Sequence, residues 1–149
     1  MWFSKKNKAE KTSSALIGGM GALVEWANDK NEIGYFKDGV VYTHLKSEIG
    51  SYAQAEKSDS YDFIYDKKII GSYLPNDSGG LVYIWHSYPT GMELVAEHFS
   101  GQKYIFPKDE DNLQTVVFNG DPVGAAAAFV ILFYGFGAGD SALRAKFLK

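Results

Sequence analysis

The sequence predicts an α+β fold: an antiparallel β-rich sheet or barrel of about eight short strands, a buried hydrophobic C-terminal helix and an N-terminal helix. Two observations carry this prediction. Short apolar segments recur at regular spacing between residues 33 and 118, separated by turn residues, which is typical of antiparallel sheets, sandwiches and barrels. Residues 122–139 then contain no charge, so a helix formed there is apolar on every side and must be buried in a core or a membrane.

Composition points to one domain and excludes some classes of protein. The 149 residues are enough for a substantial core, and aromatic residues, which favour strands, make up 15% of the chain. The net charge of −3 argues against nucleic acid as a partner, because nucleic-acid-binding proteins usually present a basic face. The absence of cysteine excludes disulfides, thiolate metal ligands and a cysteine nucleophile.

Residues 1–11 form a basic tail, in which Trp2 and Phe3 precede Lys5 and Lys6. Such a tail is either a solvated terminus or a membrane foot, with aromatic rings at the headgroup level and lysines that attract anionic lipid. The basic start superficially resembles a signal peptide, but no Ala-x-Ala cleavage site follows it. We therefore expect a retained segment, and a location in the cytoplasm or peripheral to a membrane.

A single domain is expected over residues 12–149, beginning with a helix over residues 12–28. Leu16, Met20 and Leu23 recur there at helical spacing. Three glycines in this segment each lower helix stability by ~1 kcal/mol relative to alanine. They also allow close approach of another backbone, so we expect this helix to pack against the alanine-rich face of the later apolar helix.

Eight strands are expected next, each bounded by turn residues. They cover residues 33–36, 40–45, 61–65, 69–74, 81–86, 92–99, 103–106 and 113–118. Asp38-Gly39 between the first two is a strong hairpin signal. The polar stretch 47–60 is interpreted as a loop, with room for one helical turn.

The apolar helix is predicted over residues 122–134. Asp121 can cap its first turn and Pro122 suits its first position, while glycines from Gly135 onward favour its end. About 13 residues at ~1.5 Å each span only ~20 Å, less than the ~30 Å of a bilayer core. A buried core helix is therefore favoured, with a membrane anchor over 122–139 as the alternative. The buried side chains expected from this helix are Ala126, Phe129, Val130 and Phe133.

A short final helix is expected over residues 141–148, where Asp140 or Ser141 can cap it. Leu143, Phe147 and Leu148 would then share one side of the helix.

Two stretches of the chain carry a resemblance to a known fold. They are Tyr61-Asp62-Phe63-Ile64-Tyr65-Asp66 with Lys68-Ile69-Ile70-Gly71-Ser72, and the segment from Ala126 to Phe133. Within roughly residues 33–135, the order of elements resembles the tubby-like C-terminal fold, which LURP-one proteins and phospholipid scramblases share. The resemblance is one of pattern, and it implies a hydrophobic helix threaded through a barrel. Because the chain has fewer strands and an N-terminal helix is expected, no lipid-binding residue is transferred.

The order of residues contains no recognisable catalytic or metal-binding motif. His44, His86 and His98 do not have the spacing of metal ligands. Glu93 and Glu97 share one strand face and are interpreted as solvated rather than as an acid–base pair. We expect no cofactor, although a zinc site or an enzyme site assembled from distant strands is left open.

We expect a non-enzymatic binding or scaffold module with a protein or lipid partner, and we leave open whether it acts at a membrane surface. Trp85, His86 and Tyr88 are the candidate contact surface, because Trp and Tyr dominate interface hot spots. One alternative is a self-assembling structural subunit that packs through its Gly/Ala-rich helices. Another is a membrane-anchored protein that uses segment 122–139.

Overall fold

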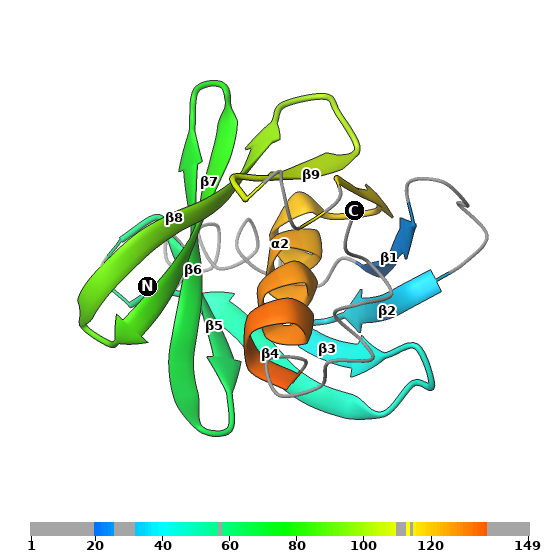
Figure 1. Ribbon diagram of the computed structural model, residues 1–149, viewed down its shortest axis with the longest axis horizontal. Coiled ribbons are helices and arrows are strands. Elements are labelled where there is room, and N and C mark those ends of the chain that lie inside the picture. Colours follow the sequence, from blue (N-terminus) through cyan, green and yellow to red (C-terminus); the bar gives the residue numbers. More distant parts are fainter. Residues whose placement is uncertain (1–19, 26–31, 57, 110–112, 114, 137–149) are drawn as a thin grey trace, which may run out of the picture.

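Ten strands form one closed antiparallel barrel in a computed structural model that describes residues 20–25, 32–56, 58–109, 113 and 115–136 (Figure 1). The strands are β1 (Met20–Glu25), β2 (Glu32–Lys37), β3 (Val40–Thr43), β4 (Glu48–Gln54), β5 (Tyr61–Tyr65), β6 (Lys68–Asn76), β7 (Gly79–Ser87), β8 (Thr90–Phe99), β9 (Tyr104–Pro107) and β10 (Val116–Asn119). From β2 to β10 each strand pairs with its successor along the chain. The barrel closes because β1 pairs with both β10 and β2.

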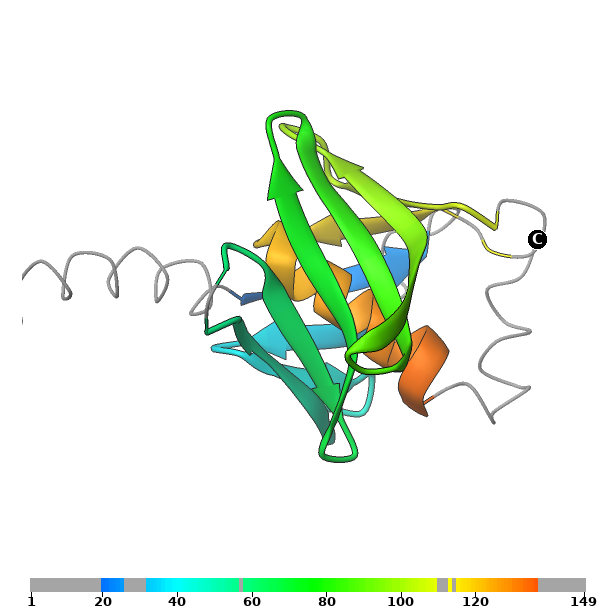
Figure 2. The same cartoon turned by 90° about the vertical axis from the view of Figure 1, so that its left-hand side faces the viewer.

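One helix runs through the barrel, as Figures 1 and 2 show from two directions. It consists of α2 (Pro122–Val130) followed by a π-helical turn, η1 (Ile131–Gly135). The Asp121 carboxylate accepts a hydrogen bond of 3.0 Å from the Val123 N–H and caps the helix. Residues 123–133 are all buried, so the barrel wall covers the helix on every side, as its uniformly apolar composition requires.

Three glycines of the wall face three consecutive residues of the helix. A Cβ at Gly71 would lie 2.8 Å from Val130 Cγ1, one at Gly50 2.9 Å from Ile131 Cδ1, and one at Gly34 2.6 Å from Leu132 Cδ1. Real Cβ atoms are essentially never this close to a neighbour. Strands β6, β4 and β2 can therefore approach the branched side chains of the helix only because these wall positions carry no side chain.

The β-rich α+β class and the C-terminal helix are confirmed, but the strand count of eight and the N-terminal helix are wrong. Residues 20–25 form β1, which hydrogen-bonds to strands on both sides instead of within a helix. Gly21 fits this role, because a Cβ there would lie 1.9 Å from the Asn119 carbonyl oxygen. Residues 12–19 and 26–28 of the expected helix lie outside the described residues.

The expected loop over 47–60 contains β4, which is the second strand that the sequence pattern did not predict. Gly50 faces the helix, and Tyr52, two residues further on, is also buried. Gly50 therefore occupies an inward position of β4. An apolar side chain there would have produced the alternation of apolar and polar residues that identifies a strand.

The apolar helix ends at Gly135, one residue beyond the predicted 122–134. Ala126, Phe129, Val130 and Phe133 are each 0% exposed. Within the described part of the chain, no helix has both the length and the hydropathy needed to span a bilayer. The expected basic tail 1–11, with Trp2, Phe3, Lys5 and Lys6, and the expected helix 141–148 lie outside the described residues.

Candidate functional site

A groove of about 720 Å³ crosses the outside of the barrel over strands β4 to β8. Because successive residues of a strand point to opposite faces, the residues that alternate with the buried wall face outward here. The pairing of the strands then sets their positions. Asp62 lies opposite Ser72, Ser72 opposite Tyr83, and Trp85 opposite Met92. We call this hollow the outer groove; its lining includes Glu56, Asp62, Ile69, Ser72, Leu74, Tyr83, Trp85, Tyr88 and Met92.

A chain of hydrogen bonds joins three strands in the outer groove. The Trp85 indole Nε1–H donates to Ser72 Oγ over 2.8 Å, and the Ser72 hydroxyl donates to Asp62 Oδ1 over 3.0 Å. Ser72 is 5% exposed, so its hydroxyl lies beneath its neighbours and is used as both donor and acceptor. This chain fixes the indole plane and one carboxylate oxygen, while Asp62 Oδ2 takes no part in it.

Large apolar side chains stand around this polar chain. Tyr88 packs edge-on against Trp85, with ring centroids 4.9 Å apart and an interplanar angle of 78°. Tyr88 is 48%, Met92 49% and Leu74 39% exposed. Single exposed apolar residues are common, but a rigid hollow that groups several of them with an aromatic pair is typical of a contact site.

The charged groups among the described lining residues of the outer groove have one sign. Its described lining residues include the carboxylates of Glu56 and Asp62 but no lysine, arginine or histidine. A cation 4 Å from one of these carboxylates would gain between ~1 kcal/mol in bulk water and ~4 kcal/mol near a protein surface. The groove therefore favours a ligand that brings a positive charge or hydrogen-bond donors together with apolar surface.

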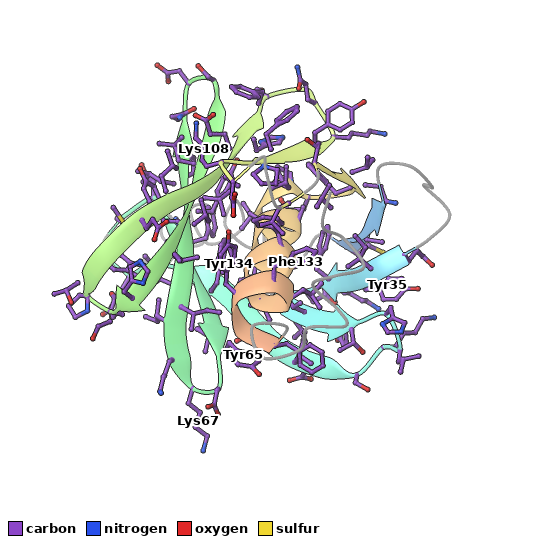
Figure 3. All side chains as sticks on the ribbon, in the orientation of Figure 1. Tyr35, Tyr65, Lys67, Lys108, Phe133 and Tyr134 are labelled. Carbon is purple, nitrogen blue, oxygen red and sulfur yellow. The ribbon has the colours of Figure 1, made fainter. Side chains whose placement is uncertain are left out.

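The three residues of the candidate contact surface share one hollow, and two of them also line the outer groove. Trp85 and Tyr88 line the outer groove, whereas His86, the neighbour of Trp85 on β7, does not. His86 Nε2 lies 2.7 Å from Glu93 Oε1. It lines a smaller hollow of about 530 Å³ with Lys67 and Lys68, which Trp85 and Tyr88 also border. Figure 3 shows Lys67 at the tip of the β5–β6 hairpin, with its side chain directed away from the barrel.

Two polar side chains inside the barrel, His98 and Tyr73, form hydrogen bonds that serve the fold. His98 Nε2 lies 3.0 Å from the Gln102 carbonyl oxygen, which can only accept, so Nε2 carries the proton. His98 Nδ1 then accepts from the Tyr73 hydroxyl over 3.2 Å. Burial lowers the pKa of His98 and raises the pKa of Tyr73 to about 12. Both groups are thus held neutral in the interior, where they satisfy one another.

The Asp121 carboxyl lies at the N-terminal end of the helix among buried tyrosines. Burial raises its pKa, while the backbone N–H groups of Val123 and Gly124 act in the opposite direction. Asp121 Oδ2 and the hydroxyl of Tyr52 are buried without a hydrogen-bond partner among the described residues. The Tyr52 side chain is 2% exposed, so this end of the barrel interior is a packed polar region rather than an open site.

The geometry of the outer groove is suited to recognition. The Ser72 hydroxyl is engaged by Asp62 and Trp85, and no histidine adjoins it that could serve as a general base. No three His, Asp or Glu side chains of the described residues are grouped so that they could hold a metal ion. The arrangement can hold an apolar group against Trp85 and present a carboxylate to a donor.

Sequence reasoning did not find Asp62, Ser72, Leu74 or Met92 as site residues. The usable signal was alternation on adjacent strands, which puts Asp62, Ser72 and Trp85 on the outer face of their strands. Comparisons with protein-family models, curated proteins and solved structures gave no match to this chain. The functional proposal therefore rests on the residues and their geometry.

Proposed function

We propose that this protein is a non-enzymatic binding module and that its outer groove receives a partner segment carrying an apolar side chain next to a positive charge. The observation that carries the proposal is the combination of an exposed aromatic and aliphatic wall with two carboxylates in one hollow. The apolar wall would supply most of the affinity, since buried aromatic contacts dominate interface energetics. The carboxylates would set specificity and orientation more than raw affinity.

The rigidity of the outer groove supports this role. Asp62, Ser72 and Trp85 belong to three adjacent strands of one barrel and are joined by hydrogen bonds of 2.8 and 3.0 Å. A preformed site loses less conformational entropy on binding than a mobile one. Strand-borne side chains also hold their geometry better than side chains on loops.

Random peptides displayed on phage and selected against the immobilised full-length protein would test the proposal. Enriched peptides are expected to contain an aromatic or large aliphatic residue beside Lys or Arg. The variant Tyr88→Ala with Met92→Ala is expected to bind them about 30-fold more weakly, which corresponds to about 2 kcal/mol. Leu45→Ala is the matched control, because Leu45 is 76% exposed and does not line the outer groove. Enrichment of peptides without a cation, or equal binding by both variants, would count against the proposal.

Action at a membrane surface is the second candidate function. Its support is the lysine pair at the tip of the β5–β6 hairpin, where Lys67 adopts a left-handed φ of 64°. A non-glycine residue in this region carries a conformational cost, and the cost is understandable if the charge is needed at the tip. Sedimentation with phosphatidylserine vesicles should fall for Lys67→Glu with Lys68→Glu and persist for Lys103→Glu. Equal sedimentation of the two variants would remove this candidate.

We also propose kinship of fold with the tubby-like C-terminal fold. The support is the order of elements, a strand meander followed by an apolar helix that lies inside the barrel. Self-assembly through the alanine-rich helix has less support, because Ala125, Ala126, Ala127 and Ala128 are each 0% exposed. An experimental structure that placed α2 outside the sheet would remove the proposed kinship.

A further inference from the structure

We propose that the N-terminal segment of this same chain, residues 2–8, occupies the outer groove. The inference rests on the proposed binding role of that groove and names one occupant for it. The segment Trp2-Phe3-Ser4-Lys5-Lys6-Asn7-Lys8 lies outside the described residues and combines two aromatic side chains with three lysines. This is the chemistry that the groove favours: apolar groups for its wall and positive charge for its carboxylates.

The charges of the described surface point to this hollow rather than to others. The outer groove contains Glu56 and Asp62 and no cationic residue among its described lining. Two other hollows carry lysines, which would repel the segment. One contains Lys67 and Lys68 and shares Trp85 and Tyr88 with the outer groove. The other, of about 580 Å³ and mainly over β1 to β3, contains Lys37 and Lys46 and, of the residues described there, a single carboxylate, that of Glu32.

The chain is long enough for the contact. Residues 9–19 connect the segment to Met20, where β1 begins, and 11 extended residues span up to ~36 Å. A folded chain of 149 residues is expected to have a radius of gyration of about 15 Å. Since a short tether gives an effective concentration on the order of millimolar, even weak intrinsic affinity would keep the groove occupied for much of the time.

Paramagnetic relaxation in the full-length protein would test the proposal. Because the chain contains no cysteine, Ser4→Cys provides a single site for a nitroxide spin label. The amide signals of β5, β6 and β7 beside the outer groove should lose intensity, and reduction of the nitroxide should restore them. Unchanged signals there, or losses centred on the hollow at Lys37 and Lys46, would overturn the proposal.

Charge variants provide the matched comparison in the labelled protein. Asp62→Asn with Glu56→Gln should weaken the broadening, with occupancy falling about twofold to fivefold per exposed ion pair. Asp77→Asn removes an exposed carboxylate that does not line the groove, and it should leave the broadening intact. Equal broadening in the two variants would contradict the charge argument.

Mixing experiments separate the named occupant from its rivals. Spin-labelled protein without ¹⁵N should be mixed with ¹⁵N protein that carries no spin label, and no broadening is expected at the groove of the ¹⁵N protein. Broadening there would mean that the N-terminal segment of one copy binds the groove of another, which would overturn the intramolecular assignment. The proposal would also be overturned if the labelled N-terminal segment bound phosphatidylserine vesicles and, in the absence of vesicles, gave no broadening at the groove. If displayed peptides bind the groove while the label never approaches it, this inference fails and the proposed function survives. If neither binds, both fail.

Discussion

Replacing Gly34 with alanine should show how tightly the barrel wall fits its helix. The new Cβ would lie 2.6 Å from Leu132 Cδ1 and 2.9 Å from the Tyr42 carbonyl oxygen. Leu132 is 1% exposed, so it cannot move aside into solvent. Overpacking of this kind costs ~1–3 kcal/mol, and we expect Gly34→Ala to lower the free energy of unfolding by about 2 kcal/mol, because the wall must shift.

A double-mutant cycle measured by urea unfolding would isolate this contact. Leu132→Ala alone should cost ~2–5 kcal/mol, through lost burial and a cavity. In the double variant the Cβ at position 34 enters the space that Leu132 vacates. We therefore expect the double variant to lose ~1–2 kcal/mol less unfolding free energy than the two single variants lose in total.

The control pairs Gly34→Ala with Val82→Ala. Val82 is 0% exposed and belongs to β7, which is five strands away from β2 in the barrel order. These two effects should add within ~0.5 kcal/mol. Additivity in the Gly34 and Leu132 cycle, or an unchanged stability of Gly34→Ala, would refute the reasoning that the helix and wall are in steric contact here.

Three further predictions concern the polar groups of the interior. Tyr73→Phe should lower the free energy of unfolding in urea by about 1–2 kcal/mol, because it leaves buried His98 Nδ1 without its donor. Tyr52→Phe should cost less, because the Tyr52 hydroxyl has no partner among the described residues. A larger loss for Tyr52→Phe than for Tyr73→Phe would contradict this account. Burial lowers the pKa of His98, so the unfolded state binds more protons and the free energy of unfolding should fall as pH drops below the ordinary value of 6.5. His98→Gln should flatten this dependence in unfolding curves recorded between pH 7 and pH 5, and an equally steep dependence in the variant would exclude His98 as its source. Asp121→Ala should lower the free energy of unfolding by about 1 kcal/mol in the same assay, because it removes the helix cap. Asp121→Asn keeps a hydrogen-bond acceptor and should be nearly neutral. Equal losses of stability in the two variants would mean that the charge of Asp121 matters rather than its capping hydrogen bond.

The end signals of the helix and the turn residues of the barrel could be predicted because they act locally. Asp121 and Pro122 define the start of α2 whatever surrounds it, and Asp38-Gly39 does the same for the β2–β3 hairpin. Strands β1 and β4 were missed because Gly21 and Gly50 stand where an inward apolar residue would be expected. The reason for these glycines is the close approach of Asn119 and Ile131, which exists only once the barrel has closed.

The site was harder to predict because it depends on register. The β5–β6 turn uses Asp66 and Lys67, with φ of 52° and 64°, in place of the Asn-Gly pair that marks such turns clearly. A bulge between Phe63 and Ile64 then shifts the pairing. Without these two facts, the sequence does not show that Asp62 faces Ser72. Trp85 and His86 line one hollow together, but of the two only Trp85 also lines the outer groove.

The closing strand also bears on how the chain reaches this fold. The seam between β1 and β10 joins residues far apart in sequence: the Ala22 N–H donates to Asn119 Oδ1 across 97 positions. Every other strand pair of the barrel joins neighbours along the chain, so this seam carries the largest loop-closure entropy. Until the seam forms, β1 and β10 are open edges, and open edges can pair with other molecules. Losing β1 would leave β2 and β10 as open edges and turn a closed surface into a template for aggregation, so the six residues of β1 protect the finished barrel as well as completing it.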